Sequence, residues 1–124
     1  MREIKFRAWD KVGKWMIKVG GIDWNKHNMF RPEPNDYSYN LDSVILMQYT
    51  GLKDKNGVEI YEGDLYYDHK RSMYPCEVYY DERYAEFRGR INGEMQPDKT
   101  YSLMFHKSWE VIGNIYENSE LVKE

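Results

Sequence analysis

The stretch Thr50–Asp64, TGLKDKNGVEIYEGD, connects an apolar run to a tyrosine-rich run. Its Asn56-Gly57 and Gly63-Asp64 pairs are turn dipeptides, because glycine adopts positive φ without strain and Asn or Asp can bond its own backbone. A phosphate-binding loop would end in Gly-Lys-Ser/Thr before a helix, whereas a strand is expected here. The stretch therefore predicts tight turns between strands.

Four carboxylates of this stretch raise the alternative of an acid–base pair or a metal site. Paired carboxylates act as acid and base only where burial and geometry give them different pKa values. We expect a turn in solvent to provide neither the burial nor the geometry. These residues are Asp54, Glu59, Glu62 and Asp64. We predict no catalytic residue among them.

Strand signals surround the stretch on both sides. Residues 41–50 contain the run Val44-Ile45-Leu46-Met47, which is typical of a strand buried on both faces. Later runs are short and alternate with turns such as Asn92-Gly93, and Asn118-Ser119 could cap a short terminal helical turn. The sequence predicts a mostly β, single-domain antiparallel fold, barrel-like or sandwich-like.

The first 21 residues predict a β-hairpin with one apolar and one cationic face. Ile4, Phe6 and Ala8 alternate with polar positions, and a turn over residues 10–13 would place Ala8 opposite Trp15. The opposite face is our candidate surface for an anion or nucleic acid, made of Lys5, Arg7, Trp9, Lys14 and Lys18. The alternative is that these lysines protect a sheet edge from aggregation.

The remaining chain is divided by composition. Residues 22–40 contain Pro32, Pro34 and several Asn and Asp residues, and predict a long irregular connection. Residues 41–117 form the main β region, and 118–124 a short tail.

Charge is distributed unevenly along the 124 residues. The net charge is -3, yet residues 1–31 hold eight Lys/Arg against three Asp/Glu. This N-terminal third is therefore the expected footprint of any anionic partner. In residues 66–91 the basic and acidic side chains balance, so the many tyrosines there indicate core and cross-strand pairs rather than a nucleic-acid platform.

Cysteine and histidine positions indicate neither a disulfide nor a metal site. Cys76 is the single cysteine, and His27, His69 and His106 lie far apart without zinc-ligand spacing. We expect no cofactor. The absence of a long apolar run favours a cytoplasmic protein without a membrane span.

Three segments together resemble the YopX family of bacteriophage and prophage proteins: REIKFRAWDK (2–11), MQYTGLKDKNGVEIYEGD (47–64) and VIGNIYENSEL (111–121). The resemblance implies a β-rich fold, expression inside a bacterial host, and no established enzymatic activity or cofactor. The positions that carry its signature, which we expect to be structural, are Tyr49, Thr50, Gly51, Leu52, Asp54, Gly57, Tyr61, Gly63 and Asp64.

These observations favour a non-enzymatic binding module. Exposed aromatics and sheet edges could engage a host or phage protein, or a second copy of the chain. The alternative function is nucleic-acid binding through the basic N-terminal hairpin.

Overall fold

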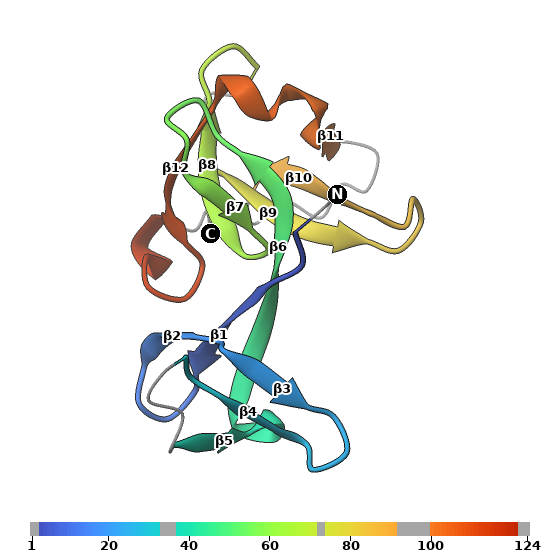
Figure 1. Ribbon diagram of the computed structural model, residues 1–124. Coiled ribbons are helices and arrows are strands. Elements are labelled where there is room, and N and C mark those ends of the chain that lie inside the picture. The colour runs from blue at the N-terminus through green and yellow to red at the C-terminus, as the bar shows by residue number, and fades with distance from the viewer. Residues whose placement is uncertain (1–2, 33–36, 72–73, 92–99, 122–124) are drawn as a thin grey trace. The chain divides into compact units, whose positions relative to one another are not determined.

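The computed structural model describes residues 3–32, 37–71, 74–91 and 100–121 (Figure 1). The expected mostly β, antiparallel fold is confirmed. Contacts within the chain gather in two compact units, Met1–Tyr49 and Thr50–Glu124.

The first unit is built from short strands. In chain order these are β1 (Phe6–Asp10), β2 (Trp15–Lys18), β3 (Gly21–Asp23), β4 (Asn28–Phe30) and β5 (Ser38–Asn40), followed by a 3-10 helix (Leu41–Ser43) and β6 (Val44–Lys53), which continues into the second unit. Strand β1 pairs with both β2 and β6, so it is an inner strand and β2 is the edge.

The predicted N-terminal hairpin forms, but its register differs from the prediction by two residues. Ala8 lies opposite Ile17, not Trp15. The cause is Asp10, whose Oδ1 accepts the backbone N–H groups of Val12 and Gly13 at 2.9 Å and so starts the loop one residue later than predicted. A shift of two residues keeps each side chain on its predicted face.

Residues 22–40 are not the irregular connection that we expected. Strands β3, β4 and β5 pair in one antiparallel sheet, in which Met29 lies opposite both Ile22 and Tyr39. Met29 is fully buried with Ala8 and Ile17 from the hairpin. The short strands form because this apolar row covers the apolar hairpin face, a long-range contact that local composition does not report.

The second unit holds the larger sheet. Its strands are β7 (Glu59–Tyr61), β8 (Asp64–Asp68), β9 (Cys76–Asp81), β10 (Glu86–Ile91), β11 (Thr100–Ser102) and β12 (Trp109–Asn114), with 3-10 helices at Leu103–Ser108 and Ser119–Leu121. Five of them follow the order β11-β10-β9-β8-β12. The expected helical turn near the C-terminus is present as Ser119–Leu121. The expected Asn92-Gly93 turn lies outside the described residues.

The core of the second unit centres on two stacked rings. Tyr66 and Trp109 are fully buried, with ring centroids 3.7 Å apart and planes tilted by 13°. The Tyr66 hydroxyl lies against Gly89, where a Cβ atom would collide with it. Burial raises the pKa of Tyr66 far above its ordinary value, so the phenol stays neutral and acts as a packing group.

Strand ends in both units share one device. An Asp or Asn side-chain oxygen accepts the backbone N–H two residues further along, which turns the chain toward the next element. The accepting residues are Asp10, Asn40, Asp54, Asp68, Asp81 and Asn114.

Candidate functional site

The residues that we proposed as a cationic hairpin face do not form one exposed surface. Lys14 and Lys18 are exposed on the hairpin. Lys5 Nζ lies 3.5 Å from Glu3 and 5.0 Å from the centroid of the Tyr49 ring. Arg7 is half-buried opposite Lys18.

Trp9 corrects our expectation of an exposed indole. Its side chain is 8% exposed, and Trp9 lies next to Ile45 and Met16 in the register of the sheet. Period-two alternation predicted its face correctly, but that face is itself largely buried, since Met47 and Tyr49 are buried too. An indole buried in this way is not available for stacking on a base.

The carboxylates of the Thr50–Asp64 stretch are not all in solvent, contrary to our expectation. Asp54 is 6% exposed and Asp64 is 2% exposed. Asp54 Oδ1 accepts N–H groups from Asn56 (2.8 Å) and Val58 (2.9 Å), and its Oδ2 accepts the N–H of Val111 (2.8 Å). Asp54 therefore ties the β6–β7 turn to strand β12.

Asp64 has a similar structural contact. Its Oδ2 accepts the backbone N–H of Tyr61 at 2.7 Å, closing the turn before β8. The three glycines of the stretch all have left-handed φ, +89° at Gly51, +80° at Gly57 and +88° at Gly63. The stretch thus requires its glycines for backbone geometry and its aspartates for turn hydrogen bonds.

The histidines lie apart and have different partners. His27 Nε2 lies 2.9 Å from Asp42, His69 Nε2 lies 3.0 Å from Glu110, and His106 Nδ1 contacts the carbonyl of Lys53. Within the described ranges, no three His, Cys, Asp or Glu side chains gather as metal ligands would. No described helix is long and apolar enough to cross a membrane.

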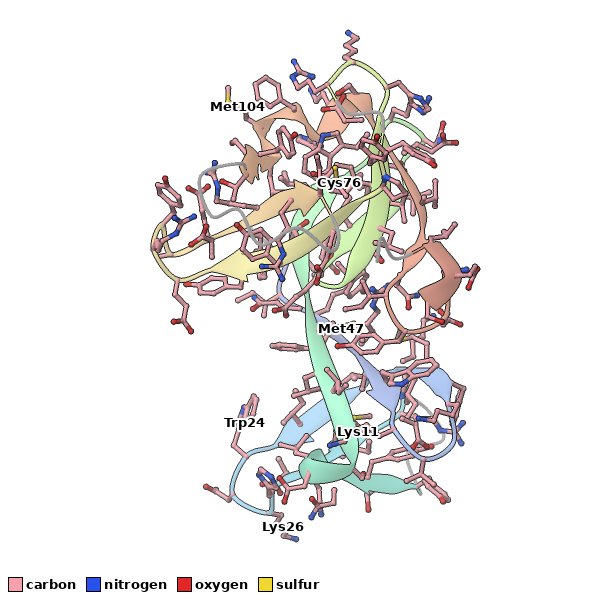
Figure 2. The ribbon with its side chains drawn as sticks, turned by 180° about the vertical axis from the view of Figure 1, so that it is seen from behind. Lys11, Trp24, Lys26, Met47, Cys76 and Met104 are labelled. Carbon is pink, nitrogen blue, oxygen red and sulfur yellow. The ribbon has the colours of Figure 1, made fainter. Side chains whose placement is uncertain are left out.

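A groove lined by apolar side chains, by Lys5 and by bare backbone lies on the surface of the first unit, and we call it the apolar groove. It encloses about 310 Å³ and is lined by Ile4, Lys5, Phe6, Val19, Gly20, Gly21, Ile22 and Trp24. The two glycines contribute no side chains to it. Ile4 is 64% exposed and Trp24 65% exposed, and Trp24 projects away from the ribbon in Figure 2.

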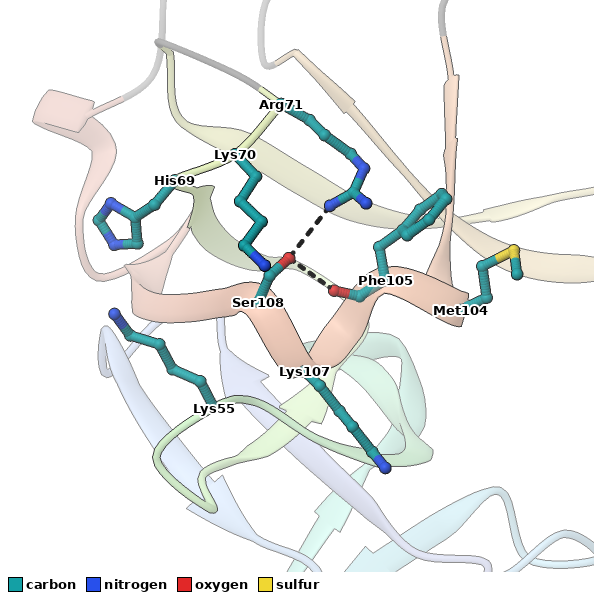
Figure 3. A pocket seen from close by; sticks show the side chains of 8 residues that line it. All are labelled: Lys55, His69, Lys70, Arg71, Met104, Phe105, Lys107 and Ser108. Atoms are coloured by element: carbon teal, nitrogen blue, oxygen red, sulfur yellow. Dashed lines mark hydrogen bonds between the residues drawn. The ribbon is translucent and has the colours of Figure 1, made fainter.

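A cationic hollow lies on the second unit. It encloses about 450 Å³, and the residues that line it are Lys55, His69, Lys70, Arg71, Met104, Phe105, Lys107 and Ser108. None of these described lining residues is acidic. Figure 3 shows that the side chains come from three separate segments: the β6–β7 turn, the turn that follows β8, and the 3-10 helix before β12.

Arg71 is held in place within the cationic hollow. Its guanidinium carbon lies 3.7 Å from the Phe105 ring centroid, and its NH1 group lies 3.3 Å from Ser108 Oγ (Figure 3). The same NH1 group lies 3.4 Å from Asp68 Oδ2. Asp68 is almost fully buried and also accepts the indole N–H of Trp109 at 3.1 Å. The hollow is thus built on the core of the second unit.

Comparison with known proteins decides the family. The profile described as YopX protein matches residues 5–123. The chain belongs to the YopX family. Among solved structures, the crystal structure of protein EF1440 from Enterococcus faecalis is similar to this chain, with 28% identity, a TM-score of 0.68, and coverage of 99% of this chain and 100% of that one. The search of curated proteins found no match to this chain.

In this YopX chain, the positions expected to carry the family signature line neither surface depression, although Lys55 of the same stretch lines the cationic hollow. The signature residues Asp54, Asp64 and Gly57 hold turns, whereas the apolar groove and the cationic hollow are lined by residues outside the signature. Our sequence reasoning missed the cationic hollow. The runs 69–71 and 106–107 were its available signal, but their joining with Lys55 depends on tertiary structure.

Proposed function

We propose that this YopX protein is a non-enzymatic binding module that engages a partner protein through the apolar groove. The observation that carries the proposal is the pair Ile4 and Trp24, two large apolar side chains that are each about two-thirds exposed beside one hollow. Exposed apolar side chains of this kind, gathered in one patch, mark interaction sites. Tryptophan in particular is enriched among the residues that dominate binding energy.

The form of the groove favours an extended apolar segment of the partner. Ile4, Phe6 and Val19 provide apolar walls, whereas Gly20 and Gly21 leave backbone without side chains. An extended segment could place apolar side chains in such a groove. Lys5 lines the same groove and can contact a carbonyl or carboxylate of the segment.

The buried carboxylates support a non-enzymatic function. Asp54 and Asp64 accept backbone N–H groups within turns. These hydrogen bonds commit both carboxylates to the turns, whereas an acid–base pair must present its carboxylates to a substrate.

The setting that we propose is the cytoplasm of a bacterium that carries the encoding phage or prophage. This follows from the resemblance to phage and prophage proteins.

The test compares two substitutions in tagged protein expressed in phage-infected host cells. Trp24→Ser removes the exposed indole of the groove, and Val12→Ser removes an 84% exposed side chain outside it. We expect Trp24→Ser to lose a co-purifying protein that Val12→Ser retains. Equal recovery with both variants would refute the groove as the site, and sedimentation of each purified variant would show whether the lost partner is a second copy.

A further inference from the structure

We propose that the cationic hollow binds a nucleotide. Its cationic side chains would hold the phosphate group, and its apolar side would contact the flat base. This site lies in the second unit and is separate from the apolar groove. Its volume of about 450 Å³ is within the range of small-molecule sites. The proposal is independent of the partner protein proposed above.

The cationic hollow is positively charged, although the chain as a whole has a negative net charge. Its lining includes four cationic side chains, Lys55, Lys70, Arg71 and Lys107, although the chain as a whole has a net charge of -3. General basicity therefore does not explain the cluster. A local surplus of positive charge attracts anions.

Nearby acidic groups leave much of this charge available. Asp68 is 3% exposed and is engaged by Trp109 and by the Lys70 backbone N–H as well as by Arg71. Glu110 lies 3.0 Å from His69. Two carboxylates thus face four cationic side chains, and neither carboxylate lines the hollow.

The arrangement of the cations suits a phosphate. Figure 3 shows the Lys70 side chain directed toward Ser108, to which Arg71 NH1 is hydrogen-bonded, while Lys55 and Lys107 point away from Ser108. Arg71 presents a plane fixed by Phe105, and a fixed guanidinium matches the geometry of phosphate oxygens better than a mobile ammonium does. Lys70 and Arg71 are the residues that we assign to the phosphate.

The apolar side of the cationic hollow distinguishes a nucleotide from an acidic peptide. Met104 is 73% exposed, and Phe105 next to it is half-buried under Arg71. A base can stack on an aromatic ring or on a guanidinium plane, and a phosphate lies one sugar away from it. An acidic peptide would present carboxylates without a flat ring and would leave Met104 uncovered.

The experiment measures binding of a fluorescent oligothymidylate by anisotropy at low and high salt. AMP, inorganic phosphate and oligoglutamate serve as competitors. We expect binding that weakens with salt, as release of counterions requires. Lys70→Glu should weaken binding by roughly tenfold or more and reduce the salt slope by about 1, the share of one phosphate-contacting lysine.

The matched control is Lys26→Glu, which makes the same charge change at the β3–β4 loop of the first unit (Figure 2). It should bind as the unaltered protein does. Met104→Ala should weaken oligothymidylate and AMP but leave competition by inorganic phosphate unchanged. Thermal melting of each variant confirms that it is folded.

The competitors also identify the source of the nucleotide. Tighter binding of oligothymidylate than of AMP indicates single-stranded nucleic acid, and equal binding per nucleotide indicates a free nucleotide. The proposal is refuted if oligothymidylate and AMP do not bind at low salt, if oligoglutamate competes as well as AMP does, or if Lys26→Glu weakens binding as much as the hollow variants.

Discussion

At the scale of the residue, Asp54 shows why a signature position can be structural. A single carboxylate accepts three backbone N–H groups, from Asn56, Val58 and Val111. Because the side chain is 6% exposed, water cannot replace these bonds at low cost. The acidic character of the stretch therefore belongs to its fold.

We predict that Asp54→Asn lowers the free energy of unfolding by about 1–3 kcal/mol, because an amide N–H₂ would face a backbone N–H that loses its acceptor. Urea denaturation measures the change. The control is Asp23→Asn. The Asp23 side chain accepts one exposed N–H, from Lys26, so this substitution should lower the free energy of unfolding less. Equal effects of the two substitutions would contradict the assigned role of Asp54.

Asp81 gives the fold a dependence on pH. Hydrogen bonding from the Arg83 side chain lowers the pKa of this carboxyl from 3.8 to about 2. Because the folded-state pKa lies below that of the unfolded chain, the stabilisation is complete above about pH 4 and disappears as the pH falls toward 2.

We therefore predict that Arg83→Gln raises the pKa of Asp81 toward 3.8. On acidification, the variant should then unfold at a higher pH than the unaltered protein does. Carboxyl-carbon NMR titration follows Asp81 directly, and melting temperatures between pH 2 and 7 follow stability. The gap in melting temperature between the two proteins should close as the pH falls. A pKa that stays near 2 in Arg83→Gln would show that the other hydrogen bonds, from Tyr79 and the Arg83 backbone, are sufficient.

At the scale of the element, the sheet β3–β4–β5 supplies what the N-terminal hairpin lacks. Ile22, Met29 and Tyr39 form a row across its three strands, and Met29 is buried with Ala8 and Ile17. Three-residue strands have little stability alone. The hairpin and this sheet therefore stabilise each other by burying one shared apolar face.

We predict that Met29→Ala lowers the free energy of unfolding by about 2–5 kcal/mol, the usual cost of emptying a fully buried methionine site. Met104→Ala is the matched control, because Met104 is 73% exposed and its removal should cost little. Denaturant unfolding of both variants, with exchange of the β1 amides as a local probe, provides the measurement. Similar stabilities would contradict the packing described for Met29.

Much of the element pattern could be predicted from sequence, because it depends on local rules. Alternation predicted the hairpin and its two faces, and turn dipeptides predicted the bends around Gly57 and Gly63. Apart from the register of the hairpin, which the local hydrogen bonds of Asp10 decide, the errors concern tertiary structure. The burial of Trp9 and Asp54, the sheet within residues 22–40, and the cationic hollow each require segments that are distant in sequence.

At the scale of the whole molecule, the signature of the YopX family and its candidate binding surfaces are carried by different residues. The signature stretch fixes the turns on which the sheets depend, and the apolar groove and the cationic hollow lie on surface elements of the first and second unit. The central claim is that the apolar groove engages a partner protein.

Site-specific photocrosslinking from position 24 in phage-infected cells tests this claim most directly. A photoreactive phenylalanine analogue replaces Trp24, and the same analogue at Val12, which is exposed outside the groove, is the control. We predict one discrete crosslinked protein from position 24 and none from position 12. The absence of a crosslink at position 24, or the same products from both positions, would contradict the account.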